Sequence, residues 1–182
     1  MILRIFRMLA TTAAGVWLGG MVLIPFVAAI TFGEMRETGV DRPEAIAGQV
    51  MARNFQRFDQ IQMICACVLL VWQITHLAAA ARRMTDWLRL LVILMASGLL
   101  VYSMYVVTPM ILELQPEVAH AGGALSAKAS FSEFHEAAVR IGKINLFLVA
   151  SIALSLAWLP RVDSPRQDSS GVEEPDAGRG TA

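Results

Sequence analysis

The chain has 182 residues and no net formal charge, and 56% of its residues are apolar while only 16% are charged. Typical soluble domains carry about 25% charged residues, so this composition excludes an ordinary soluble domain. A neutral chain also lacks the overall field that attracts nucleic acid, which we exclude as a partner. The partner that the composition predicts is the lipid bilayer.

Four long apolar runs follow one another along the chain. The first has 25 residues without a charged side chain, and the four runs are Met8–Phe32, Ile61–Ala81, Leu90–Leu112 and Ile144–Pro160. A helix rises about 1.5 Å per residue, so about 20 apolar residues cross a hydrocarbon core about 30 Å thick. The sequence therefore predicts an all-α, four-helix transmembrane bundle over residues 1–160. A disordered acidic tail is expected at residues 161–182.

The first run is too long for the apolar part of a signal peptide, so we expect an uncleaved anchor. It contains Gly15 and Gly19, which form a G-x-x-x-G pattern around Trp17. Small residues four positions apart let helix backbones approach closely in lipid. We expect these three residues to pack helices together within one chain, with contact between copies in a homo-oligomer as the alternative.

Two amphipathic segments, Glu44–Gln60 and Phe131–Lys143, lie in the two connections on one side of the bundle. In the first, one helical stripe is apolar and the polar residues lie elsewhere around the helix, namely Gln49, Arg53, Gln56 and Asp59. We expect both segments to extend spans two and four as helices and to pack against each other, because apolar stripes are normally buried. The alternative is a cleft between them that binds a ligand or partner. Its residues would be Arg57 and His135 as hydrogen-bond donors beside Phe55, Phe58 and Phe131.

The orientation follows from basic residues near the ends of the spans. With four spans, both termini lie on one side, and the Lys and Arg residues divide evenly between the two sides. The short turn at residues 82–89 is rich in arginine, which favours cytoplasmic termini. The many arginines and alanines are typical of a GC-rich bacterial genome, so we expect the bacterial inner membrane.

Titratable groups are scarce in the spans. We expect no Asp or Glu deep in any of them, which argues against the usual proton-relay site of a transporter. His76 lies near the end of span two and is interpreted as an interfacial histidine that caps helix carbonyls near Arg82. His120 and His135 belong to the opposite side of the membrane, so we expect no bis-histidine haem. No nucleotide-binding loop indicates a flavin, and the expected cofactor is therefore none.

Binding of copper is a further possibility that the sequence leaves open. Met63, Cys65 or Cys67, His120 and His135 could approach one side of the membrane, and soft ligands suit Cu(I). However, no Met-x-x-Met or His-x-x-His spacing fixes a geometry, so whether any metal binds is unknown. Cys65 and Cys67 lie about 200° apart around a helix and cannot form a redox pair of the C-x-x-C type.

Three short motifs resemble the small membrane proteins of the domain of unknown function 4149 family, which is related to transmembrane protein 205. The motifs are Val16-Trp17-Leu18-Gly19-Gly20 with Pro25 and Phe32, Ala47-Gly48-Gln49-Val50-Met51 with Phe55, Arg57 and Phe58, and Phe131-Ser132-Glu133-Phe134-His135 with Asn145. The chain departs from the family pattern at Gln56, where the family tends to have proline. The resemblance implies a four-helix membrane protein and brings no established reaction.

Three functions remain open. The first is a non-enzymatic scaffold or partner subunit, bound to another membrane protein or to a second copy. The second is a membrane protein that handles a small solute or a metal ion such as copper. The third is a subunit of a membrane oxidoreductase. No catalytic residue is assigned, because the sequence shows no nucleophile motif or paired carboxylates.

Overall fold

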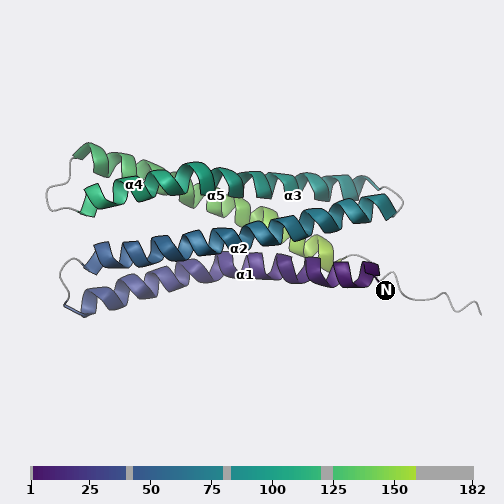
Figure 1. Cartoon of the computed structure of the whole chain (residues 1–182), viewed down its shortest axis with the longest axis horizontal. Coiled ribbons are helices and arrows are strands. Elements are labelled where there is room, and N and C mark those ends of the chain that lie inside the picture. Colours follow the sequence, from purple (N-terminus) through teal and green to yellow (C-terminus); the bar gives the residue numbers. More distant parts are fainter. Residues whose placement is uncertain (1, 40–42, 80–82, 120–124, 159–182) are drawn as a thin grey trace, which may run out of the picture.

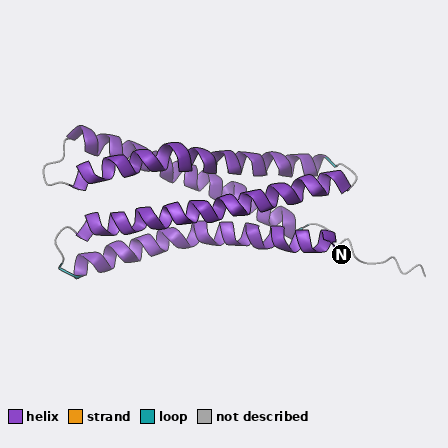
Figure 2. Cartoon of the chain, viewed as in Figure 1, coloured by secondary structure: helices purple, strands orange, loops and turns teal. Residues whose placement is uncertain are grey.

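The computed structural model describes residues 2–39, 43–79, 83–119 and 125–158. Its elements are α1 (Ile2–Glu37), α2 (Pro43–Ala79), α3 (Met84–Tyr102), the π-helical turn η1 (Ser103–Val107), α4 (Thr108–Ala119) and α5 (Leu125–Ala157). Figure 2 shows that the described chain is helical almost throughout. The predicted tail at residues 161–182 lies outside the described residues.

Four rods are long and apolar enough to cross a membrane: Arg4–Glu37, Ala45–Ala79, Met84–Pro116 and Lys128–Ala157. The third rod is built from α3, η1 and α4 in direct succession. The predicted all-α fold with four membrane-spanning helices is thus confirmed. The rods have 30 to 35 residues each. They are therefore about 45–53 Å long and exceed a hydrocarbon core of about 30 Å.

The helices extend further than the apolar runs predict. The first apolar run ends at Phe32, but α1 continues to Glu37, and a turn follows in which Gly39 has a φ of 63°. Glycine adopts this left-handed conformation without the clash of a Cβ atom. The third apolar run ends at Leu112, but α4 continues to Ala119. In both places the backbone hydrogen bonds of the helix continue across residues that have polar side chains.

The rods form an antiparallel bundle in which α1 lies beside α2, and α2 beside α3 (Figure 1). The last helix, α5, runs diagonally behind the others and packs against α4, α3 and α1. We call residues 21–37, 43–61, 103–119 and 125–144 the distal half, and the remainder of the four rods the proximal half. The α1–α2 pair and the α4–α5 pair lie further apart in the distal half, at the left of Figure 1.

The apolar core occupies the proximal half. Its largest fully buried side chains include Trp17, Leu69, Ile93, Ile152 and Leu156. Large apolar side chains that point away from the bundle are exposed, for example Leu23 at 62% and Phe26 at 65% on α1. Lipid tails would cover such faces, because a membrane protein needs no polar surface at that depth.

The π-helical turn has a local cause in the sequence. Pro109 has no backbone N–H, and in a regular helix its ring would meet the carbonyl of residue 105. The turn Ser103–Val107 lies directly before this proline. A π turn adds one residue to the helix and so relieves the clash. It also changes the face that α4 presents to its neighbours.

The contact between α1 and α2 fixes their relative positions. The indole Nε1 of Trp17, which is fully buried, donates a 2.7 Å hydrogen bond to Oε1 of Gln62. One turn further on, a Cβ atom on Gly20 would overlap the ring of Phe58, so the helices approach closely there. By contrast, a Cβ atom on Gly15 or Gly19 would meet open space. Trp17 thus packs within the chain, and the close approach lies at Gly20 rather than at the Gly15–Gly19 pair.

Candidate functional site

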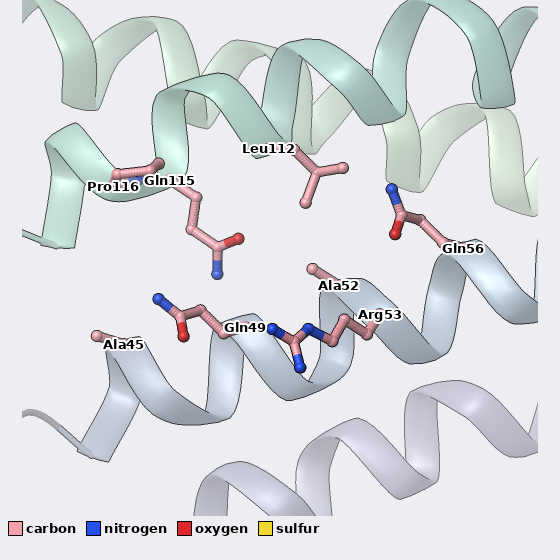
Figure 3. Close-up of a pocket in the computed structure, with 8 residues that line it drawn as sticks. All are labelled: Ala45, Gln49, Ala52, Arg53, Gln56, Leu112, Gln115 and Pro116. Carbon is pink, nitrogen blue, oxygen red and sulfur yellow. The ribbon is translucent and has the colours of Figure 1, made fainter.

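A cleft of about 250 Å³ lies between α2 and α4 in the distal half, and we call it the α2–α4 cleft. Its lining residues are Ala45, Gln49, Ala52, Arg53 and Gln56 from α2, and Leu112, Gln115 and Pro116 from α4. Figure 3 shows the amide groups of Gln49 and Gln115 turned toward each other across the gap. The cleft therefore offers three side-chain amides and one guanidinium group between two helices.

A small residue on α2 allows this approach. A Cβ atom on Gly48 would overlap Nε2 of Gln115, so the amide of Gln115 lies directly over the backbone of α2. Gln115 is half-buried, whereas Gln49 and Gln56 are exposed. Gln115 thus lies against α2 near Gly48, whereas the α2 amides of the cleft are more accessible.

The α2 residues of the cleft continue into the bundle at Asp59. Ala45, Gln49, Ala52, Gln56 and Asp59 follow one another at steps of four and three, which places them on one helical stripe. Gln56 is exposed, but Asp59 is only 9% exposed. In the described part of the chain, Asp59 has no hydrogen bond or ion pair. Asp59 thus lies within the second candidate span, Ala45–Ala79, whereas the sequence analysis placed it in an extension before that span.

The depth of Asp59 follows from the contact between α1 and α2. Because Trp17 bonds Gln62 and Gly20 meets Phe58, Asp59 lies opposite residues 19–20 of α1. That position is the middle of the uncharged run 8–32, about 18 Å from either end. Arg53 precedes Asp59 by six residues and so lies opposite residues 25–26 of α1. The sequence signal was the set of polar residues Gln49, Gln56 and Asp59, which we interpreted as the polar side of a helical extension of span two.

The residues of the predicted cleft are spread over several surfaces. Phe58 packs against α1 at Gly20, whereas Phe55 is 41% exposed. Arg57 is exposed and lies two positions before Asp59, about 200° away around the helix. It therefore faces away from the side on which Asp59 is buried. None of the three lines the α2–α4 cleft.

The other part of the predicted cleft lies on α5. The rings of Phe131 and His135 stack, with centroids 6.1 Å apart and planes 7° from parallel. Among the described residues, no hydrogen bond, ion pair or ring contact joins His135 to Arg57. Packing between α2 and α5 is also not among the main helix contacts of the described chain. A ligand or partner between the two segments stays a prediction.

A second polar group lies in the proximal half, where α2, α3 and α5 meet. Nη1 of Arg89 lies 3.4 Å from Oδ1 of Asp86, and both side chains are 7% exposed. Nε of Arg89 donates a 3.1 Å hydrogen bond to Oγ of Ser155 on α5. The sequence analysis had placed residues 82–89 in a short turn between two spans. One turn inside α3 is enough to bury Asp86 and Arg89, which the apolar runs alone did not reveal.

Two residues of α2 complete this group. Nε2 of Gln73 donates a 2.7 Å hydrogen bond to the carbonyl oxygen of Asp86, and Gln73 is fully buried. Nε2 of His76 lies 3.7 Å from Oδ1 of Asp86, and its ring stacks on Trp72 with centroids 5.4 Å apart. His76 thus faces a carboxylate of α3 instead of the helix carbonyls that we expected. The group joins three helices, and we interpret it as structural.

Metal-ligating residues are dispersed. Within the ranges that the structure describes, no three His, Cys, Asp or Glu residues lie close enough to share a metal ion. Cys65 is buried and Cys67 is exposed, so the two thiols point to different sides of α2. His120, one residue of the hypothetical copper set, lies outside the described residues. Metal binding stays open.

Comparison with known proteins adds one match. A family profile described as "Domain of unknown function (DUF4149)" matches residues 12–120. This range covers more than half of the chain and includes α2, α3, most of α1 and the helix α4 that forms the other wall of the cleft. No curated protein and no solved structure matches the chain.

Proposed function

The chain belongs to the family described as "Domain of unknown function (DUF4149)", and for this membrane protein we propose a non-enzymatic role in binding a small anionic solute. The α2–α4 cleft is the proposed binding site. The observation that carries the proposal is a set of hydrogen-bond donors that lines a cavity between two membrane helices. Polar groups at such depth face a cavity, a ligand or another protein, because lipid cannot satisfy them.

The chemistry of the lining favours an anion. Arg53 presents a planar guanidinium group, which can donate two parallel hydrogen bonds to a carboxylate or a phosphate. Gln49, Gln56 and Gln115 add N–H donors on both walls. Among the lining residues that the structure describes, Arg53 is the one charged side chain, and its charge is positive. A cavity of about 250 Å³ holds a small molecule such as a short carboxylic acid or a phosphate ester.

Thermal unfolding of the detergent-purified protein tests this proposal. A ligand that binds only the folded state raises the unfolding temperature in proportion to the logarithm of its concentration. We expect inorganic phosphate or acetate to raise it, and potassium chloride at equal ionic strength to leave it unchanged. Arg53→Gln should abolish the increase.

The matched control is Arg57→Gln. Arg57 lies one turn from Arg53 and is exposed, but it does not line the cleft. The control should keep the full increase in unfolding temperature. Equal loss in both variants would contradict a specific site at Arg53, and so would a wild-type protein that responds to neither anion.

A second candidate is a scaffold or partner subunit, which the exposed aromatic side chains of the distal half favour. Phe55 is 41% exposed, and His135 is exposed with its ring stacked on Phe131. Aromatic residues are enriched in protein interfaces. Co-purification from native membranes tests this candidate, since Arg57→Ala with His135→Ala should release a bound partner without lowering thermal stability. Retention of the partner would contradict it.

We also place the protein in the bacterial inner membrane with both termini in the cytoplasm. The arginine-rich turn before α3 supports this orientation. Thr38, at the end of α1, and Thr85, in the first turn of α3, are both exposed and lie at opposite ends of the bundle. An impermeant thiol reagent added outside should label Thr38→Cys and not Thr85→Cys. The reverse result would reverse the orientation.

A further inference from the structure

We propose that the α2–α4 cleft is a water-filled vestibule, which enters the membrane from the side opposite the start of α1 and ends at the carboxyl group of Asp59. This inference deepens the proposed function and rests on it, because it names the route by which a solute reaches the cleft. It assigns Asp59 as the inner end of that route.

The first argument is the depth of the polar residues. Two contacts, Trp17 with Gln62 and Gly20 with Phe58, place α2 residues 49–59 beside α1 residues 19–30. This stretch of α1 carries no charge, and Leu23, Phe26 and Ile30 within it are 62–65% exposed. Such a surface is typical of contact with lipid tails. The cleft therefore lies at the depth of the hydrocarbon core.

The second argument is that α2 and α5 both change from apolar to polar at the same level of the bundle. Arg89 bonds Ser155, so Lys143 of α5 lies opposite about residue 101 of the third rod, in the middle of the uncharged run 90–112. Arg140 and Glu136 follow one and two turns further on, and their side chains are 73% and 68% exposed. At this level α2 and α5 carry charged side chains, while residues 19–30 of α1 and 101–112 of the third rod carry none. Water between the two pairs of helices would satisfy the polar rods, because charge at bilayer depth requires a polar surrounding.

The third argument is that the route has a closed end. Asp59 is the last member of the cleft stripe and is 9% exposed. Beyond it, Gln62 is hydrogen-bonded to Trp17, and the side chains of the next two turns are buried in the apolar core, including Ala66 and Leu69. A carboxyl group without a protein partner is costly in an apolar surrounding, and water at the bottom of a vestibule would remove that cost.

The test is thiol accessibility in intact membranes, with both native cysteines first replaced by alanine. Single cysteines replace Ala52, Gln56 and Asp59 on the stripe, and Leu23 and Phe26 on α1 at the same depth. A membrane-impermeant maleimide, added from the side on which Thr38→Cys reacts, should label the stripe positions. The two α1 positions should stay unlabelled, because a thiol in lipid does not ionise. If Asp59→Cys does not fold, Ala52→Cys and Gln56→Cys carry the test.

Three results would overturn the vestibule. Stripe positions that stay unlabelled would show a dry cleft, and labelling only from the opposite side would show the wrong entrance. Equal labelling of Leu23→Cys and Phe26→Cys would show that the distal half projects from the membrane into water. The outcome is distinct from that of solute binding, because labelled stripe positions together with no anion response would retain the vestibule and reject the proposed function.

Discussion

The hydrogen bond from Nε1 of Trp17 to Oε1 of Gln62, 2.7 Å long and buried, holds α1 and α2 in one register. In that register the polar stretch of α2 lies at the same level as the uncharged middle of α1, and not beyond the end of α1. A shift of one helical turn, about 5.4 Å, would move Arg53 appreciably toward the membrane surface. This single contact therefore sets the depth of the cleft and of Asp59.

Removal of one partner of this bond should destabilise the protein. Trp17→Phe leaves the Gln62 carbonyl without its donor in a site that is only 6% exposed. A buried unsatisfied polar group costs about 1–3 kcal/mol. The free energy of unfolding, measured by denaturant titration in detergent, should fall by that amount. The double variant Trp17→Phe with Gln62→Leu should lose less than the sum of the two single variants. Strict additivity would contradict the assigned pairing.

Gly20 should tolerate no side chain, whereas Gly15 should. A Cβ atom at Gly20 would overlap the ring of Phe58, but at Gly15 it would meet open space. We expect Gly20→Ala to lower the unfolding temperature of the purified protein and Gly15→Ala to leave it unchanged or raised. Phe58→Leu should partly restore Gly20→Ala by making room for the methyl group. Equal effects of the two glycine variants would contradict the close approach at Gly20.

Loss of one member of the Asp86–Arg89 pair should lower the free energy of unfolding more than loss of both members. Arg89→Gln removes the guanidinium partner of the Asp86 carboxylate in a site that is 5% exposed. Breaking a buried ion pair from one side costs about 3–5 kcal/mol. The double variant Asp86→Asn with Arg89→Gln should recover much of this loss in the free energy of unfolding. If the double variant is less stable than Arg89→Gln alone, the prediction is contradicted, and the pair stabilises the bundle by more than the neutralisation of its two charges.

Gly48 offers a variant that acts on the cleft alone. An added methyl group would displace the amide of Gln115, which is the flexible end of a side chain and can move away at little cost. We expect Gly48→Ala to keep the thermal stability of the unliganded protein while it weakens the response to phosphate or acetate. Gly15→Ala serves as the control, since it should affect neither quantity. An unchanged anion response in Gly48→Ala would show that Gln115 does not contribute to binding.

The helices were predictable from sequence because an uncharged run of more than 20 residues has few alternatives in a membrane protein. The four spans, and the extension of α2 and α5 beyond their apolar runs, followed from the spacing of apolar residues alone. The ends of α1 and α4 were less predictable. Glu34, Arg36 and Glu113 resemble loop residues by composition, but the backbone hydrogen bonds of a helix do not depend on them.

The candidate site was less accessible to sequence reasoning, because depth depends on pairing between helices. Asp59 was interpreted as part of an extension outside the membrane, since span two was counted from its own apolar run. Only the contact of Trp17 with Gln62 shows that this part of α2 lies beside the middle of span one. Asp86 and Arg89 were similarly assigned to a short turn, and the contact of Arg89 with Ser155 joins positions 66 residues apart.

Spin labels at Gln56 and Phe26 provide the most direct test of the central claim, which is that a polar, hydrated cleft lies at the depth of lipid-facing apolar residues. Both positions belong to the distal half, and Phe26 is 65% exposed on α1. In reconstituted vesicles, collisions with a water-soluble nickel complex and with oxygen report water and lipid, respectively. We expect the label at Gln56 to collide mainly with the nickel complex and the label at Phe26 mainly with oxygen. The same preference at both positions, for either reagent, would contradict the claim.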